Sequence, residues 1–410
     1  MVMEVLFVIF IASCIVIAGF LSNVLFRRTG FPDIVLLIFL GILLGPILKL
    51  FSFESLLPVM PYLTALTLVM ILSKGGLEMD IGRAVSRAPR AIVLGTLYVS
   101  LCTLVISLIV EYALKLGWLR SLMLGAMVPG TSSVVIIPLM SKMRGEKETS
   151  MTLTLETEVT DVLNIVFVTS ILQAYLTGMV AAGNILSSIA SRFSVGIVFG
   201  FILGGLWIAV LYLARNEEYV YMFTLGVILL QYAVVEWLGG SGILSSFSFA
   251  LVLGNDRTFI SFMKMKIEPI ESKVRNFIEG IQSELSFLMR AFFFVSLGLM
   301  YQFSIDGILI ASGLFLVSLV IRYVAASVSM WRSKLSANKV FMTLMCGQGL
   351  AHATISTLPL QSGVPGASIY TMVVLNIIVF SNIVTSASAF LFMYKNRRSE
   401  TKKPSNTKPT

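Results

Sequence analysis

Residues 151–173, MTLTLETEVTDVLNIVFVTSILQ, have the length and the apolar C-terminal half of a membrane-spanning helix. Within its first turns this stretch nevertheless carries three acidic side chains, Glu156, Glu158 and Asp161. Each carboxylate inside a bilayer costs roughly 2.5–3.5 kcal/mol on insertion scales. Three such groups so close together indicate a functional site or a set of buried ion pairs, and we expect the rest of the chain to supply their partners.

The composition is that of a helical membrane protein. Of the 410 residues, 57% are hydrophobic and only 12% are charged, and a soluble domain has about twice that charged fraction. Lys and Arg exceed Asp and Glu, for a net charge of +9, and they cluster in alternate loops, which is the positive-inside pattern. We therefore expect a multi-pass protein of the cell membrane, with its N-terminus outside, its C-terminus cytoplasmic and no nucleic-acid partner.

Apolar runs of about 20 residues, the length that crosses a bilayer, recur along the whole chain. They predict an all-α fold of about thirteen spans, at 4–26, 33–50, 58–77, 91–113, 119–142, 150–176, 190–213, 218–237, 241–255, 284–302, 306–330, 339–361 and 367–394.

The fifth and twelfth spans are interrupted, by PGTSS at 129–133 and by GQGLAH at 347–352. Each is the fifth helix of a six-helix set (spans 1–6 and 8–13), and the seventh span connects the two sets. Gly/Pro interruptions at matching places are typical of inverted repeats whose broken helices cross at a binding site in the middle of the membrane. The sequence therefore predicts two inverted six-helix repeats with crossed broken helices.

Asp161 is the strongest candidate for a binding group. Residues three or four apart share a helix face, which groups Glu158, Asp161 and either Asn164 or Ile165 along one edge. A carboxylate is a hard oxygen ligand, and it holds a proton more tightly when it is desolvated. We expect Asp161 to bind a monovalent cation and a proton in turn; the alternative is that the acids form ion pairs that fix helix packing.

Two other ionisable side chains inside predicted spans are candidates for a role at this site. Arg322, in the eleventh, must face the bundle interior and find an acidic partner, and the three acids of the sixth span are its candidates. His352, the only histidine of the sequence, lies beside the break in the twelfth span. It is either a hydrogen-bonded packing residue or a group that modulates activity with pH.

Together these motifs resemble the monovalent cation–proton antiporter superfamily, most closely its NhaP-type sodium–proton exchangers. The resemblance covers the chain except its tail. It rests on the segments TGFPDIVLLIFLGILLGP, KGGLEMD, GAMVPGTSSVV, LETEVTD, FFFVSLGL and GQGLAHATIS, together with Arg322.

The resemblance implies a domain organisation. A dimer (scaffold) domain would comprise residues 1–90 and 218–303, and a core (transport) domain residues 91–178 and 304–394. Residues 179–217 would be a linker helix, and residues 395–410 a disordered cytoplasmic tail. A homodimer is implied, in which each core moves against its scaffold as in an elevator.

The resemblance also assigns roles in the sixth span, where the family pattern is Glu-Ser-x-x-Asn-Asp. In that register Asp161 is the essential carboxylate that holds Na⁺, Thr157 is a hydroxyl ligand, and Glu156 is the acid paired with Arg322. Glu158 has no family role and remains a possible second acid.

The chain departs from the family pattern at two positions. Thr160 replaces the family asparagine and is not the aspartate of electrogenic relatives. In the fifth span, the family's Thr-Asp-Pro becomes Thr131, Ser132 and Ser133, so a serine replaces the second cation-binding acid. The expected cation- and proton-binding set is Asp161, Thr131, Ser132, Thr157 and Thr160.

The expected activity is exchange of a monovalent cation, Na⁺ first, for H⁺, without a cofactor. A single exchangeable acid predicts electroneutral exchange. The alternatives are a potassium–proton antiporter and a sodium-coupled symporter of the same architecture. A channel is disfavoured because polarity is confined to the two breaks and the sixth span, and an enzyme because no clustered set of reactive side chains is found.

Overall fold

The computed structural model describes residues 2–29, 31–50, 58–141, 147–178, 182–214, 217, 219–264, 269 and 272–400. Within these ranges every regular element is a helix, and eight helices are long and apolar enough to cross a membrane. The elements are α1 (Val2–Thr29), α2 (Asp33–Ile42), η1 (Leu43–Ile47), α4 (Met60–Glu78), α5 (Ile81–Leu114), α6 (Trp118–Met127), α7 (Ser133–Ser141), α8 (Lys147–Thr177), α9 (Ala182–Leu213), α10 (Val220–Trp237), α11 (Gly242–Gly254), α12 (Asp256–Phe262), α13 (Ser272–Leu299), α14 (Ile305–Ser329), η2 (Lys334–Asn338), α15 (Lys339–Leu344), α16 (Leu350–Gln361) and α17 (Ser368–Glu400).

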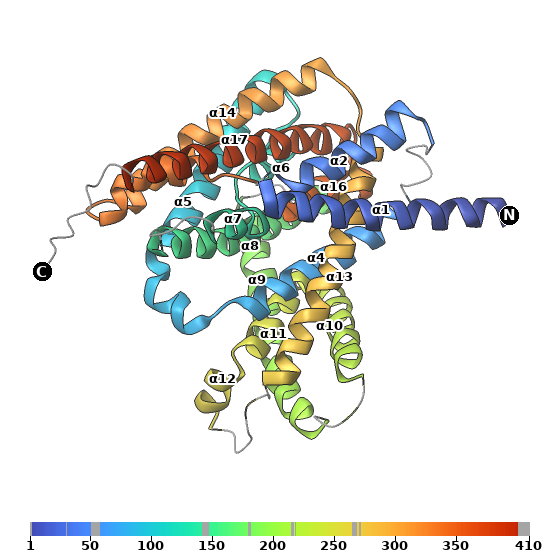
Figure 1. Ribbon diagram of the computed structural model, residues 1–410, viewed down its shortest axis with the longest axis vertical. Helices are drawn as coiled ribbons and strands as arrows, with labels where there is room; N and C mark the ends of the chain where they lie inside the picture. The colour runs from blue at the N-terminus through green and yellow to red at the C-terminus, as the bar shows by residue number, and fades with distance from the viewer. Residues whose placement is uncertain are drawn as a thin grey trace, which may run out of the picture.

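Each predicted span coincides with one helix or with two consecutive ones, so the all-helical multi-pass fold is confirmed. Figure 1 shows α10, α11 and α12 at one end of the molecule and α14 and α17 at the other. One expected boundary differs. α17 continues to Glu400, so residues 395–400, expected in the disordered tail, are helical, because Lys395, Arg397 and Arg398 are good helix formers. The rest of that tail, 401–410, lies outside the described residues.

Both predicted interruptions are present. α6 ends at Met127 and α7 begins at Ser133, whereas α15 ends at Leu344 and α16 begins at Leu350. Gly130 has φ +133°, a backbone conformation open to glycine but not to other residues at low cost. The backbone N–H of Ser132 donates to the carbonyl of Gly347 at 2.8 Å. The two unwound segments therefore contact each other, as expected for crossed broken helices.

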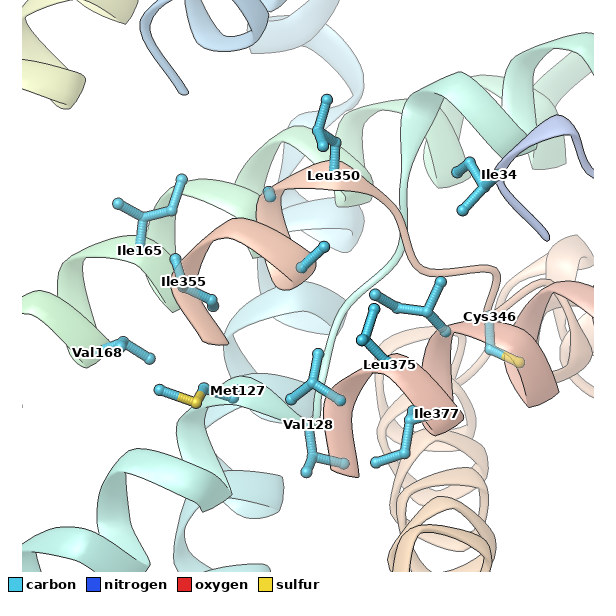
Figure 2. Close-up of a cluster of buried hydrophobic side chains, with 14 of the residues drawn as sticks. Ile34, Met127, Val128, Ile165, Val168, Cys346, Leu350, Ile355, Leu375 and Ile377 are labelled. Carbon is cyan, nitrogen blue, oxygen red and sulfur yellow. The ribbon is translucent and has the colours of Figure 1, made fainter. Parts of the chain in front are cut away.

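Apolar side chains surround the two unwound segments. Figure 2 shows Met127 and Val128 at the end of α6, with Leu350 and Ile355 on α16 and Ile165 on α8. All five are buried. Backbone groups freed by a helix break in such surroundings must find partners inside the protein, and this requirement positions the polar side chains of the site.

Glycines bring neighbouring helices unusually close. A Cβ added at Gly200 of α9 would lie 2.5 Å from the carbonyl oxygen of Ser245 on α11. One added at Gly41 of α2 would overlap the carbonyl of Val295 on α13. Small residues allow such backbone-to-backbone packing in membranes, where helix association depends on van der Waals contact. The close contact at Gly200 therefore packs α9 tightly against α11.

Candidate functional site

Asp161 of α8 lies at the wall of a cavity of about 540 Å³. Its side chain is buried, with 6% of the residue exposed. The cavity is enclosed by parts of α1, α2, α4, α7, α8, α13 and α16, through the residues Asn23, Phe26, Arg27, Asp33, Ile71, Leu72, Lys74, Gly75, Glu78, Ile137, Glu158, Asp161, Ser283, Ser286, Phe287, Arg290 and Leu350. A buried carboxylate is thus within reach of an open polar space.

Charged side chains line this cavity in pairs. The guanidinium of Arg290 on α13 lies 3.1 Å from the carboxylate of Asp33 on α2. Lys74 of α4 donates to the hydroxyl of Ser283 at 3.0 Å and lies 3.7 Å from the carboxylate of Glu78. The sequence alone contains no sign of the Asp33–Arg290 pair, because its members lie on helices far apart in the chain.

Arg322 of α14 and Glu156 of α8 form a fully buried ion pair. The two guanidinium nitrogens Nη1 and Nη2 donate to Oε1 and Oε2 of Glu156 at 2.8 and 3.0 Å, and both side chains are 0% exposed. Arg322 also donates to the carbonyls of Met342 and Met345 at 3.2 and 3.0 Å. The carboxylate partner of Arg322 in the structure is therefore Glu156 and not Asp161.

The Arg322–Glu156 pair also reaches the two broken spans. Met342 lies in α15 and Met345 in the unwound segment that follows it. On the other side, the hydroxyl of Thr131 donates to Oε2 of Glu156 at 3.1 Å. One buried ion pair thus connects α8, α14 and both interruptions.

The hydroxyl groups expected to surround Asp161 are engaged elsewhere. Thr157 donates to the carbonyl of Thr154 at 2.7 Å, and Thr160 donates to the carbonyl of Thr157 at 3.0 Å. Their oxygen atoms keep lone pairs, so these bonds leave a ligand role open. Ser132 lies against Gly349, where an added Cβ would overlap its hydroxyl. The structure thus places Ser132 between the two crossing segments.

Glu158 is partly exposed and lines the same cavity as Asp161. Its carboxylate lies against α4, because a Cβ added at Gly75 would be 2.7 Å from Oε2 of Glu158. Glu158 therefore faces the neighbouring helix across the cavity, whereas Glu156 points into the protein toward Arg322.

His352 of α16 is brought to Asp161 by the crossing. Its Nδ1 lies 3.9 Å from Oδ1 of Asp161, and its Nε2 lies 2.8 Å from the carbonyl oxygen of Pro129. Asn164 donates to the same carbonyl at 2.5 Å. Sequence reasoning placed Asn164 on the edge that carries Asp161 but assigned it no role, because its partner is a carbonyl freed by the break in another span.

Amide and hydroxyl side chains of α17 form hydrogen bonds with the free backbone groups of the second unwound segment. The side-chain amide of Asn382 donates to the carbonyl of Gln348 at 2.8 Å, and the hydroxyl of Ser381 accepts from the backbone N–H of Gln348 at 3.1 Å. Thr385 accepts from the backbone N–H of Cys346 at 3.1 Å. One face of α17 therefore holds this segment in its non-helical form.

The arrangement can hold one small cation or one proton. It contains a buried carboxylate at a cavity wall, a neighbouring acid already neutralised by an arginine, and two helix breaks beside it. Among the described residues, no group of three or more His, Cys, Asp or Glu side chains could hold a metal ion.

Comparison with known proteins gives a consistent result. A family described as "Sodium/hydrogen exchanger, transmembrane" matches residues 10–394. The K(+)/H(+) antiporter NhaP2 of Shewanella sp. (strain MR-4) is 27% identical over 379 residues, which is 88% of this chain and 62% of that protein. The chain therefore spans less than two thirds of the length of this relative. The Na(+)/H(+) antiporter 1 of Methanocaldococcus jannaschii is 28% identical over 330 residues, 76% of this chain and 74% of that protein.

A solved structure has the same fold. The sodium proton antiporter MjNhaP1 from Methanocaldococcus jannaschii at pH 8 superposes with a TM-score of 0.80. The superposition covers 96% of this chain and 99% of that one, at 24% sequence identity. At this level of identity the likeness concerns the fold, and the roles of individual residues depend on the geometry described above.

Proposed function

Because the chain belongs to the sodium/hydrogen exchanger family of multi-pass membrane proteins, we propose that it exchanges one monovalent cation for one proton at Asp161. The observation that carries this proposal is the difference between two neighbouring acids. Glu156 is enclosed and paired with Arg322, whereas Asp161 lines the cavity. Of these two acids, only Asp161 is placed to exchange its bound cation or proton with water.

Cation and proton compete for the same carboxylate. A bound cation needs Asp161 ionised, and a bound proton neutralises it, so one load excludes the other. The unwound segments and the ends of the half-helices supply fixed partial charges beside the site. Thr157, Thr160, Ser132 and Thr131 are the further members of the proposed site, as hydroxyl groups around the carboxylate or beside its supporting ion pair.

Exchange without net charge movement follows from this set. Thr160 and Ser132 are neutral where charged relatives carry acids, which leaves Asp161 as the one acid of the expected cation- and proton-binding set. One cation then crosses for one proton. Voltage imposed across the membrane is therefore expected to have little effect on the rate.

Alternating access is proposed as an elevator movement. The cavity that reaches Asp161 lies between α1, α2, α4 and α13 on one side and α7, α8 and α16 on the other. These sets fall in the proposed scaffold (1–90 and 218–303) and core (91–178 and 304–394) respectively. The cavity therefore follows the boundary along which a core would slide.

The other end of α4 supports this view. There, Gln361 of α16 donates to the hydroxyl of Thr64 at 2.8 Å, which joins the proposed core to the proposed scaffold. The cavity residues Lys74 and Glu78 lie at the opposite end of the same helix. By the positive-inside rule that end is cytoplasmic, so the cavity at Asp161 is proposed to open to the inside, and a second cavity of about 500 Å³, lined in part by Thr64 and Gln361, lies at the outer end of the same helix.

The proposed cation is Na⁺, with K⁺ as the alternative. One similar protein is named a Na(+)/H(+) antiporter and another a K(+)/H(+) antiporter. The test is purified protein in proteoliposomes with an imposed pH gradient, to which Na⁺, K⁺ and Li⁺ are added in turn. Recovery of the fluorescence of a pH-sensitive dye after addition of a cation identifies the transported ion. The same assay with an imposed K⁺-diffusion potential measures the voltage dependence of exchange. No response to any of these cations would refute the antiporter proposal. A response that needs a co-transported solute would favour the symporter.

A further inference from the structure

Three buried acceptor atoms beside the crossing are unsatisfied. Within the described part of the chain, no hydrogen-bond donor reaches Oδ1 of Asp161, Oδ1 of Asn164 or Nδ1 of His352. The three residues are 6%, 1% and 0% exposed. A buried polar atom without a partner costs about 1–3 kcal/mol, so three together indicate that something else is bound there during the working cycle.

The carbonyl of Pro129 explains why these ends are free. It lies 2.5 Å from Nδ2 of Asn164 and 2.8 Å from Nε2 of His352. A carbonyl oxygen only accepts hydrogen bonds, so the amide nitrogen of Asn164 points at it, and His352 donates to it in the tautomer that carries the proton on Nε2. The opposite ends of the two side chains, Oδ1 and Nδ1, are then left as acceptors.

Gly130 makes this arrangement possible. The break at Pro129 and Gly130 removes the carbonyl of Pro129 from helical hydrogen bonding and turns it toward α8 and α16. A Cβ at Gly130 would overlap Nε2 of His352 and come within 2.7 Å of Nδ2 of Asn164. Only glycine lets both side chains approach the carbonyl.

The three free atoms cannot satisfy one another. Nδ1 of His352 lies 3.9 Å from Oδ1 of Asp161, beyond the ~3.2 Å limit of an N–H···O hydrogen bond. An imidazolium with a proton on Nδ1 would be drawn to the carboxylate and close this gap. Two acceptors that face each other at this distance have room for a positive group between them.

The separation suits a small hard cation. Ca²⁺, which has nearly the radius of Na⁺, binds oxygen at roughly 2.3–2.6 Å. The 3.9 Å between Nδ1 of His352 and Oδ1 of Asp161 therefore leaves room for such an ion beside the carboxylate. Nε2 of His352 and Nδ2 of Asn164 lie 3.0 Å apart, as two groups that share the Pro129 carbonyl, and Asn164 lies about one helical turn after Asp161 on the same face.

We propose that the amide oxygen of Asn164 is a ligand of the transported cation at Asp161, and that His352 is the residue that positions it. Hard cations prefer carboxylate and carbonyl oxygen over imidazole nitrogen, so the two oxygen atoms are the ligands. His352 shares the Pro129 carbonyl with Asn164, which fixes the direction of the amide. This inference rests on the proposed exchange at Asp161 and extends its ligand set beyond the hydroxyl groups.

Two substitutions at Asn164 separate a ligand from a structural residue. Asn164→Leu removes both the donor to Pro129 and the oxygen ligand. Asn164→Asp also removes the donor but keeps an oxygen atom in place. A ligand role predicts that only Asn164→Leu loses cation affinity, whereas a purely structural role predicts equal damage from both.

The measurement is the cation KM of exchange in proteoliposomes, with the maximal rate determined in the same series. We expect Asn164→Leu to raise the KM about tenfold or more, the loss of one bond to a charged group, and Asn164→Asp to keep or lower the KM, because its carboxylate oxygen is itself a ligand for a hard cation. Asn376→Leu is the matched control, because this buried asparagine of α17 bonds to Tyr301 instead, at 2.9 Å. If Asn164→Leu does not fold, the shift in thermal midpoint that NaCl produces for Asn164→Asp decides: retention supports the ligand role and loss refutes it.

His352 is tested by rescue. His352→Leu removes the donor to Pro129 and should raise the KM with a smaller effect on the maximal rate. His352→Gln supplies an N–H for the same carbonyl and should restore most of the affinity; failure of this rescue would refute the positioning role. Asp161→Asn is measured beside these variants. Exchange retained by Asp161→Asn would refute the proposed function, whereas its loss together with an unchanged KM for Asn164→Leu would refute this inference alone.

Discussion

Removal of Arg322 should destabilise the protein more than any single loss of an exposed arginine. The guanidinium makes two hydrogen bonds to Glu156 at 2.8 and 3.0 Å and two more to backbone carbonyls. It also lies over the ring of Tyr98, 5.0 Å from its centroid. Arg322→Leu leaves a carboxylate and two carbonyls buried without their partner. Breaking one side of a buried ion pair costs about 3–5 kcal/mol, a large part of the ~5–15 kcal/mol by which a protein is folded.

The assay is unfolding of the purified protein in detergent, for Arg322→Leu, Glu156→Leu and the double variant. The exposed Arg257 of α12 provides the control, as Arg257→Leu. Because the two side chains contact each other, we expect the double variant to cost less than the sum of the single ones by about 0.5–3 kcal/mol. A change within about 0.5 kcal/mol for Arg322→Leu, the range of ordinary surface substitutions, would refute the reasoning. Strict additivity of the two substitutions would do the same.

Three other substitutions test the architecture. Gly130→Ala should lower the thermal midpoint and abolish exchange, because a side chain would adopt a left-handed φ at a cost of about 1–3 kcal/mol and overlap His352; near-normal transport would mean that the crossing tolerates a shift. Gly200→Leu should cost at least about 1–3 kcal/mol by forcing α9 away from Ser245, and an unchanged melting curve would contradict the packing of α9 on α11. Thr160→Asp should make exchange respond to an imposed membrane potential, because it adds a second exchangeable acid. If the rate of this variant does not change with voltage, residue 160 does not determine the net charge moved per cycle.

The spans and their interruptions could be predicted because they depend on local features of the sequence. Apolar length determines whether a segment crosses the bilayer, and the adjacent Pro129 and Gly130 disfavour a continuous helix. The end of α17 was misplaced for a related reason. The basic segment that begins at Lys395 was predicted to be disordered, although Lys and Arg are good helix formers and α17 continues to Glu400.

The partners of the buried polar groups could not be derived from spacing alone. Arg322 and Glu156 are 166 residues apart, and helix periodicity left three acids as candidates. The register of the related family singled out Glu156, and the coordinates contain that contact. Asn164 has no counterpart in that register. Its significance depends on the Pro129 carbonyl, which is available only because two unwound segments cross there.

The surroundings of Glu158 could not be derived from helix spacing either. On the helix it lies near Asp161, which suggested a second acid of one site. In the structure Glu158 lines the same cavity as Asp161, with its carboxylate against α4, where Gly75 leaves room for it; its role as a second acid stays a prediction. Whether a side chain on this edge faces the protein interior or the cavity depends on the neighbouring helix, which spacing along α8 does not define.

The central claim is that Asp161 carries the cation and the proton in turn. It is tested most directly by cation-dependent proton flux in proteoliposomes that contain either Asp161→Asn or the exposed-carboxylate control Asp306→Asn, which lies in the first turn of α14. We predict that Asp161→Asn, folded and correctly inserted, shows no dye response to Na⁺, K⁺ or Li⁺, and that Asp306→Asn behaves like the unsubstituted protein. Exchange that persists in Asp161→Asn would contradict the account.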